Sequence, residues 1–229
     1  MPVELMLPGR RIPAPLPPSY LALDMAFGVG NPAILGDKSR YRSHGTIVGA
    51  VPAAGVHGYC LDFDPTIPSY VEIPAAHTQL NFIAEDFSVV MRVNMDDTTI
   101  SRWLFIRGRE IVDGWGIRMD AGGRVRAFTW QTPATQQSMT NPGDFVIATD
   151  YTVGLTRSGA SCRIYRNGVD RTALPDVHIN PLTCARSAKI GVYDNLVGNP
   201  FDGKIEFCRV FRNIALTTSE HLAWHNALA

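Results

Sequence analysis

The sequence predicts an all-β chain in which two antiparallel sheets stack face to face, with one short helix near the C-terminus. Strand-like segments recur roughly every 8 to 15 residues with turn residues between them, which is the spacing of antiparallel sandwiches. The dipeptides Gly122-Gly123 and Asn167-Gly168 supply two hairpin turns. A helix-start signature occurs only at Thr217, close to the end of the chain.

The first 19 residues differ from the rest because they carry six prolines and no apolar periodicity. Proline fixes φ and removes a backbone donor, so residues 1–19 are predicted to form an extended arm outside both sheets. Such an arm would lie along its own domain or a neighbouring molecule, and the alternative is a flexible N-terminal segment. One domain is then expected over residues 20–229, because no linker interrupts it.

The central strands are read from alternation. Residues 87–94 place Phe87, Val89, Met91 and Val93 on one face and polar side chains on the other, which predicts a half-buried strand. Residues 114–120 and 124–130 are joined through Gly122-Gly123 as a hairpin. In residues 124–130 the pattern leaves two assignments open for Phe128 and Trp130, the core or the outer face of the sheet.

The C-terminal segment predicts a strand followed by a helix. Residues 205–211 are apolar on both faces, as in a central strand of a packed sheet. Thr217 and Glu220 have the spacing of a capping box, in which each side chain bonds the other residue's backbone amide. These signals place the last strand in the middle of a sheet and begin a helix after Thr217.

Composition excludes several classes of protein. The 21 Lys and Arg residues balance 21 Asp and Glu residues, whereas a non-specific nucleic-acid binder needs a basic surplus. The apolar run at residues 46–56 contains Pro52 and is shorter than the roughly 20 residues of a membrane span. The first residues lack a secretory signal, so we expect assembly in the cytoplasm or in a virion.

The four cysteines, Cys60, Cys162, Cys184 and Cys208, form no C-x-x-C pair that would indicate a zinc or redox motif. Three of them stand in apolar, strand-like contexts. They are predicted to be buried free thiols, with a disulfide as the alternative.

Several motifs together resemble the laminin-G-like jelly roll of the concanavalin A-like lectin/glucanase superfamily. The resemblance runs from about residue 21 to residue 227 and implies a two-sheet jelly-roll fold. Glu206 stands where the family frequently has Asp. The matching segments are Asp37-Lys-Ser39, residues 58–64, 69–74 and 86–93, Ile164-Tyr-Arg-Asn-Gly168, and Phe201, Gly203, Ile205, Arg209, Val210, Phe211, Ala215, Leu216, Thr217 and Glu220.

The same resemblance raises the question of catalysis, because glucanases on this fold place two carboxylates two to four positions apart on one strand. The nearest pairs are Asp62 with Asp64 and Asp202 with Glu206, but no third carboxylate or tryptophan run accompanies them. His221 and His225 lack the glutamate of a zinc-protease motif. The chain is therefore predicted not to be an enzyme.

Two kinds of binding site are implied by the resemblance. Many such domains bind calcium through loop oxygens, for which Asp24, Asp194, Asn199 and Asp202 are the candidates, although Asp and Asn are also ordinary turn residues. Sugars stack on exposed aromatic rings. The candidate ligand-binding residues are Trp115, Arg124, Arg126, Phe128 and Trp130.

Three functional hypotheses follow. The first is a non-catalytic structural or attachment component of an assembled particle, a phage capsid decoration or tail protein, whose partners are copies of itself or other capsid and tail subunits. The second is a carbohydrate-binding lectin module of a cell-surface or secreted protein. The third, a glycan-cleaving enzyme, is disfavoured by the carboxylate pattern. All three depend on analogy, because a fold does not determine a function.

Overall fold

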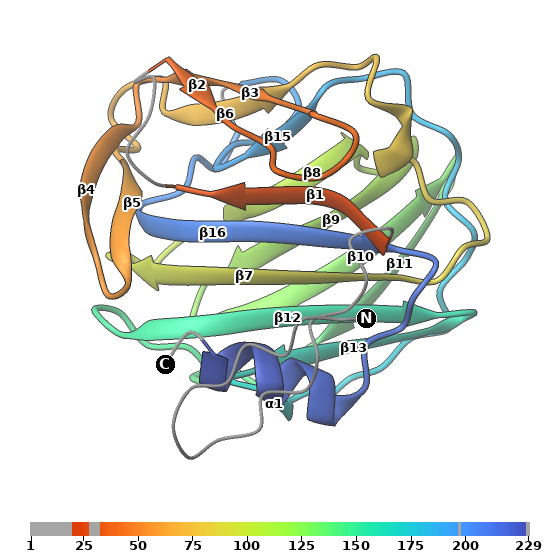
Figure 1. Ribbon diagram of the computed structural model, residues 1–229. Coiled ribbons are helices and arrows are strands. Elements are labelled where there is room, and N and C mark those ends of the chain that lie inside the picture. Colours follow the sequence, from red (N-terminus) through yellow and green to blue (C-terminus); the bar gives the residue numbers. More distant parts are fainter. Residues whose placement is uncertain (1–19, 28–32, 197, 228–229) are drawn as a thin grey trace, which may run out of the picture.

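The computed structural model describes residues 20–27, 33–196 and 198–227, and these residues build two antiparallel sheets of eight strands each (Figure 1). The predicted arm, residues 1–19, lies outside the described residues. The front sheet, nearer the viewer in Figure 1, contains β1 (Leu21–Ala26), β4 (Val51–Gly55), β5 (Gly58–Phe63), β7 (Phe87–Met95), β12 (Asp150–Ser158), β13 (Ser161–Arg166), β14 (Val169–Asp170) and β16 (Gly203–Arg212).

The rear sheet lies behind the front sheet, and its long strands cross the front strands obliquely (Figure 1). A 3-10 turn, η2 (Thr78–Leu80), interrupts the connection between the sheets, and one helix, α1 (Thr218–Ala227), follows the last strand. This arrangement confirms the predicted two-sheet jelly-roll sandwich with one C-terminal helix. The rear sheet contains β2 (Ile34–Leu35), β3 (Gly45–Val48), β6 (Tyr70–Ile73), β8 (Arg102–Arg109), β9 (Asp113–Asp120), β10 (Arg124–Gln131), β11 (Ala134–Met139) and β15 (Ala188–Ile190).

The core fills the space between the sheets and contains a group of aromatic rings. Phe82 stacks on Phe87 with ring centroids 4.4 Å apart, and Trp115 stacks on Phe105 at 4.9 Å. The indole Nε1 of Trp115 donates to the Leu80 carbonyl at 2.9 Å, so the polar atom of this buried ring is satisfied. The long connection between β6 and β7 is thereby fixed to the core.

The predicted turns and cap are confirmed. Gly122 and Gly123 join β9 to β10 with φ of 79° and 69°, and Asn167 and Gly168 join β13 to β14 with φ of 53° and 78°. These positive values are what a type I′ turn requires. The backbone amide of Thr217 donates to Glu220 Oε2 at 2.7 Å, and the amide of Glu220 donates to Thr217 Oγ1 at 3.3 Å, which completes the capping box.

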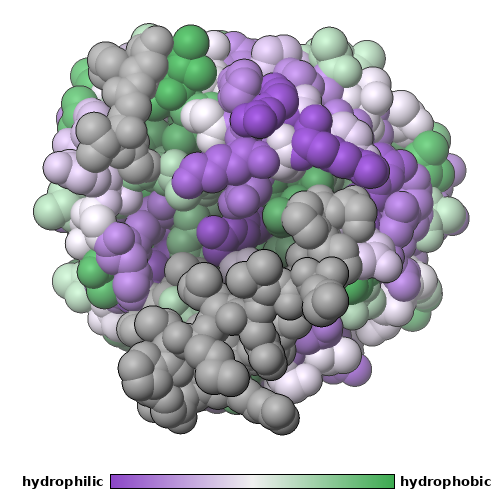
Figure 2. Space-filling view, in the orientation of Figure 1, coloured by the Kyte–Doolittle hydropathy of each residue, from purple (hydrophilic) through white to green (hydrophobic). Residues whose placement is uncertain are grey.

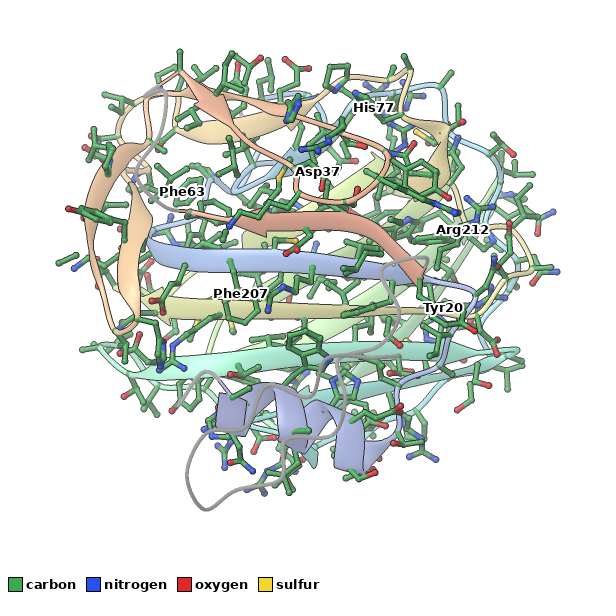
Figure 3. The ribbon with its side chains drawn as sticks, in the orientation of Figure 1. Tyr20, Asp37, Phe63, His77, Phe207 and Arg212 are labelled. Carbon is green, nitrogen blue, oxygen red and sulfur yellow. The ribbon has the colours of Figure 1, made fainter. Side chains whose placement is uncertain are left out.

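Asp37 organises the loop that follows β1 (Figure 3). Its buried carboxylate accepts the amides of Asp24 and Ser39 at 2.8 Å on Oδ1. The amide of Ser43 and the hydroxyl of Ser39 donate to Oδ2 at 2.7 Å. The Asp37-Lys-Ser39 motif therefore closes this loop through four hydrogen bonds to one side chain.

Strand β7 differs from the half-buried strand predicted for residues 87–94. Most of its polar face is covered, since Ser88 and Arg92 are both buried and only Asn94 is half-buried. The chain after β16 crosses this face, where Ser88 Oγ donates to the Ile214 carbonyl at 3.1 Å and accepts the Leu216 amide at 2.8 Å. The prediction was wrong because alternation reports only the side-chain pattern, whereas a later segment decides whether a polar face meets water.

Helix α1 lies along β12 and β13 on the outward side of the front sheet (Figure 1). The buried ring of His221 stacks on Tyr165 at 4.0 Å, and its Nε2 bonds Thr156 Oγ1 at 2.8 Å. A Cβ at Gly154 would lie 2.5 Å from His221 Nδ1, so β12 needs glycine to admit this ring. One turn later, His225 Nδ1 bonds Thr152 Oγ1 at 3.1 Å. The two histidines thus fasten the helix to the sheet.

All four cysteines are buried, and none is bonded to another, as the sequence predicted. Burial raises the pKa of Cys162 to about 12 and also raises that of Cys208. They pack as small apolar side chains. Within the described residues, no helix has the length and apolar character needed to cross a membrane.

Candidate functional site

Strand β10 resolves the two assignments that the sequence left open. Val125 and Ala127 belong to the core between the sheets, so Arg124, Arg126, Phe128 and Trp130 share the outer face of the rear sheet. Phe128 and Trp130 are nevertheless only 2% and 0% exposed. Trp115, predicted to be an exposed aromatic, lies in the core instead, because its β9 position pairs with the inward-facing Thr129.

Other side chains cover the aromatic rings on this outer face. Trp103 and Ile106 complete a small cluster with Phe128 and Trp130, and Tyr193 packs against it. The guanidinium of Arg118 lies over the rings of Trp103 and Phe128, 5.3 Å and 5.0 Å from their centroids. This cation–π contact and the surrounding packing leave Trp103, Phe128 and Trp130 at most 2% exposed, too little for a ring face to stack on a sugar. The cluster functions as a second small core.

The two candidate arginines on this face differ in their contacts. Arg126 forms an ion pair with Asp120, which Arg118 also binds through Nε at 2.9 Å. Among the described residues, Arg124 makes one polar contact, from Nη1 to the sulfur of Met139 at 3.3 Å. The structure therefore brings the four β10 candidates to one face, but as a closed cluster rather than a ligand site.

The calcium candidates do not converge on one position. Asp24 pairs with Arg209 at 2.8 Å in the front sheet, whereas Asp194 pairs with Arg109 at 2.7 Å in the loop after β15. In this loop too, the carbonyl of Asn199 accepts the Trp103 amide at 3.0 Å. Asp202 lies 3.4 Å from Arg102. Among the described residues, no three His, Cys, Asp or Glu side chains are grouped to hold a metal.

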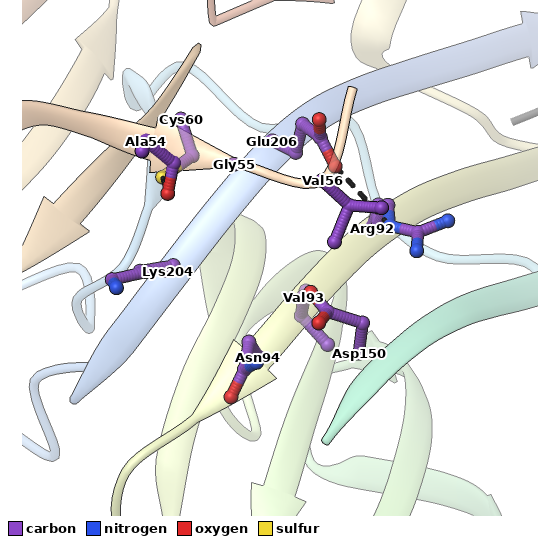
Figure 4. Close-up of a pocket in the computed structure, with 10 residues that line it drawn as sticks. All are labelled: Ala54, Gly55, Val56, Cys60, Arg92, Val93, Asn94, Asp150, Lys204 and Glu206. Atoms are coloured by element: carbon purple, nitrogen blue, oxygen red, sulfur yellow. Dashed lines mark hydrogen bonds and ion pairs between the residues drawn. The ribbon is translucent and has the colours of Figure 1, made fainter. Parts of the chain in front are cut away.

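A pocket of about 180 Å³ opens on the outward side of the front sheet (Figure 4). Its floor is formed by β7, β16 and the start of β12, and the hairpin of β4 and β5 forms one wall. In the space-filling view of this side, hydrophilic side chains gather over the upper middle and right of the face (Figure 2). The lining residues are Ala54, Gly55, Val56, Cys60, Arg92, Val93, Asn94, Asp150, Lys204 and Glu206.

Glu206 fixes the wall of the pocket to its floor. It occupies a β-bulge in β16, between Ile205 and Phe207, and bulges commonly redirect side chains near sites. The amide of His57, at the tip of the β4–β5 hairpin, donates to Glu206 Oε1 at 2.5 Å. Arg92 Nε lies 3.2 Å from Oε2, so the carboxylate joins the hairpin to β7 (Figure 4).

A polar row crosses the pocket floor. Asp150 on β12 pairs in register with Asn94 on β7, which pairs with Lys204 on β16. Lys204 in turn pairs with Asp62 on β5. Directly opposed residues of neighbouring antiparallel strands point to the same face. Register alone therefore brings these four side chains, distant in the sequence, into one line.

Three side chains of this row have no hydrogen-bond or ion-pair partner among the described residues. Asn94, Asp150 and Lys204 are half-buried, and their side chains form no hydrogen bond or ion pair within 4 Å among the residues that the structure describes. Polar groups partly removed from water without partners are costly in a folded protein. Donor and acceptor groups therefore remain available at the pocket floor.

Of the carboxylates considered from the sequence as catalytic pairs, Glu206 lines the pocket and Asp62 pairs in register with the lining residue Lys204. Burial raises the pKa of Asp62, with Lys204 opposing the rise and Asp96 and Asp64 adding to it. Burial also raises the pKa of Asp202, where Arg102 opposes the effect. Asp202 is bound by Arg102 and Glu206 by Arg92, so these two acids serve different ion pairs.

Sequence reasoning missed this pocket, although one of its signals was visible. The alternation of β7 placed Arg92 and Asn94 together on the face opposite the core. The sequence does not give the strand register, which places Asp150 and Lys204, from strands far away in the chain, beside Asn94. No single strand carries the constellation.

Comparisons with known proteins support the fold. A family profile described as "Concanavalin A-like lectin/glucanases superfamily" matches residues 66–220, which confirms the resemblance seen in the sequence. Among curated proteins, none matches the chain.

Three solved structures illustrate the likeness. The binding domain of Paraclostridial Mosquitocidal Protein 1 has a TM-score of 0.75 and 14% identity, over 92% of this chain and 53% of that one. The Botulinum neurotoxin serotype G binding domain has a TM-score of 0.69 and 11% identity, over 91% of this chain and 51% of that one. The third is domain 4 of AbnA, a GH43 extracellular arabinanase from Geobacillus stearothermophilus, in complex with arabinotriose. It has a TM-score of 0.65 and 18% identity, over 89% of this chain and 97% of that one.

The chain thus spans about half of each toxin binding domain and nearly all of the arabinanase domain. At these identities the likeness shows a shared fold alone.

Proposed function

Because the chain belongs to the concanavalin A-like lectin/glucanases superfamily, we propose that it is a non-catalytic, lectin-like module that binds a glycan in the pocket of the front sheet. The complex of the similarly folded arabinanase domain with arabinotriose supports a carbohydrate as the ligand class. The closed aromatic cluster of the rear sheet offers no comparable opening.

The observation that carries this proposal is the set of unpartnered polar groups on the pocket floor. Binding sites combine a concave surface with a few convergent polar groups that orient the ligand. Asn94 offers both donors and an acceptor, Lys204 offers donors, and Asp150 offers acceptors. Sugar hydroxyls both donate and accept, so a single ring can satisfy all three side chains.

The size of the pocket limits what it takes. Pockets for drug-sized ligands measure about 300–1,000 Å³. At about 180 Å³, this pocket suits one sugar ring, with the rest of a glycan extending outward along the β4–β5 hairpin. The exposed Tyr59 and Val56 on that hairpin offer an apolar surface for the following ring.

Glycan cleavage does not form part of the proposal. Both oxygens of Glu206 are engaged by groups of the chain itself, Oε1 by the His57 amide and Oε2 by Arg92. A glycosidase acid or nucleophile must instead reach the scissile bond. We therefore expect a bound oligosaccharide to be recovered intact after prolonged incubation.

Replacing Asn94 with Ala tests the site. We expect Asn94→Ala to weaken binding of the tightest ligand on a glycan array by about tenfold, because about 1.4 kcal/mol of hydrogen bonding is removed. Arg124→Ala on the outer face of the rear sheet is the matched control and should leave binding unchanged. Isothermal titration with the full chain measures both. Loss of binding with Arg124→Ala and not with Asn94→Ala would move the site to the rear sheet.

A narrower role as a phage virion attachment or decoration protein remains our proposal from the sequence. Its support is the proline-rich arm, residues 1–19, and the neutral net charge. If the arm binds a neighbouring subunit, the full chain should elute as an oligomer in size-exclusion chromatography and a chain without residues 1–19 as a monomer. Identical elution of the two chains at the monomer position would remove this support.

A further inference from the structure

We propose that the pocket selects sugars that carry a protonated amino group, and that the Asp150 carboxylate binds this group. The inference rests on the proposed glycan-binding function and specifies the ligand class. It follows from the balance of charge among the groups inside and around the pocket.

The two buried charges of the pocket offset each other. Glu206 lies against Arg92, and the amide of His57 adds a further donor to the same carboxylate. Both residues are at least nine-tenths buried, so their interaction is only weakly screened by solvent. This pair leaves no net charge for a ligand to meet.

The positive charge of Lys204 is also offset, in this case by the negative charge of Asp62 at the next position of the row. The positive charge of Lys204 lowers the pKa of Asp62 against the effect of burial, which shows that the two charges act on each other. An acidic sugar placed on Lys204 would meet the negative charge of Asp62 on the same face. Lys204 is therefore better suited to donate to a hydroxyl than to hold a carboxylate.

Asp150 is the charge that remains. Its half-buried carboxylate makes no hydrogen bond or ion pair to any described residue. It stands about two strand spacings from Lys204, roughly 10 Å, with Asn94 between them. One ring over Asn94 can therefore present an ammonium group to Asp150 and hydroxyls to Asn94 and Lys204.

The carboxylates around the pocket also favour a positively charged ligand. Asp64 and Asp96 raise the pKa of both Asp62 and Asp202, while Lys204 opposes the rise at Asp62 and Arg102 opposes it at Asp202. Such a surface attracts cationic ligands and repels anionic ones. Charge complementarity thus favours an amino sugar over both a neutral sugar and a uronic acid.

Three trisaccharides with the full chain at pH 6 and low salt test this inference. They are the glucosamine trisaccharide, its fully N-acetylated form and the galacturonic acid trisaccharide. We expect the glucosamine form to bind about tenfold more tightly than the N-acetylated form, with galacturonate weakest. This preference should decrease in 0.5 M NaCl, because salt screens the charge interaction.

The variants assign the preference to one residue. Asp150→Asn keeps the shape and should reduce the tenfold ratio to within twofold, while binding of the N-acetylated form changes less than twofold. Glu110→Gln removes the same charge from a half-exposed position in the rear-sheet loop after β8, where Glu110 lies 3.8 Å from Arg118, and should leave the ratio intact.

Three results would overturn the inference. Equal binding of the glucosamine and N-acetylated forms, or preference for galacturonate, would refute amino-sugar selection while leaving an Asn94-dependent glycan site in place. Failure of the glucosamine trisaccharide to bind would also refute it. In that case the glycan array with Asn94→Ala separately decides whether the pocket binds any sugar.

Discussion

Asp37→Asn should lower the free energy of unfolding by about 3–5 kcal/mol, as measured by urea denaturation at pH 7. The carboxylate accepts four hydrogen bonds, three of them from backbone amides. The asparagine amide nitrogen would face donors on one side of this cradle, and those donors would lose their acceptor while remaining buried. Such a loss is a large part of the about 5–15 kcal/mol that stabilises a typical domain.

The chain offers a matched control in Asp64-Pro-Thr66. Asp64 Oδ1 accepts the amide and hydroxyl of Thr66 at 2.8 Å and 2.6 Å, in the same spacing as Asp37 and Ser39 but at an exposed position. Asp64→Asn should cost less than about 1 kcal/mol, because water replaces the lost partner. Equal destabilisation by the two variants would show that burial of Asp37 is not the source of its contribution.

Lowering the pH from 7 to 5 should remove about 4 kcal/mol of stability through two buried histidines. Burial lowers the pKa of His221 to about 3 and that of His178 to about 4. Unfolded histidine titrates near about 6.5. Below that pH the unfolded chain binds protons that the folded chain cannot, so stability is complete above pH 6.5 and is lost as the pH falls.

The partners of these rings explain why protonation is disfavoured. His221 is bonded to the neutral hydroxyl of Thr156 and stacked on Tyr165, and among the described residues no carboxylate affects its pKa. His178 lies between the hydroxyls of Thr129 and Ser138 at 3.0 Å and 2.9 Å. Asp176 raises the pKa of His178 and Arg157 lowers it, but burial is the largest influence.

Urea denaturation at pH 7 and pH 5 measures the effect. Replacing both His178 and His221 with Gln should flatten the dependence on pH, whereas His77→Gln, at a half-exposed position, should leave it unchanged. A wild-type free energy of unfolding that is the same at both pH values would contradict the assignment.

Much of the fold could be predicted because its signals are local. Turn residues with positive φ at Gly122-Gly123 and Asn167-Gly168, and the capping pair Thr217 and Glu220, act within a few residues of one another. Their geometry follows from backbone sterics and short-range hydrogen bonds, which the sequence states directly. The alternation along β10 likewise limited Phe128 and Trp130 to two assignments, the core or the outer face of the sheet.

The candidate site could not be predicted in the same way. The aromatic residues of β10 were reasonable candidates, but Arg118 and Tyr193, which cover them, come from other segments. The histidines of α1 gave no functional signal in the sequence, yet they fasten the helix to β12. Each outcome depends on which segment lies over an outward face.

Residue order over short stretches of the chain was enough to predict the two-sheet class, the principal turns, the capped terminal helix and the superfamily. The assembled fold was needed to show that the outward face of β7 is covered at Ser88 but open at Asn94, that Trp115 is internal, and that Asp150, Asn94 and Lys204 lie in one row. Strand register decides the row and the place of Trp115, since a shift of one residue would turn these side chains to the opposite face. The segment after β16 decides which part of β7 is covered.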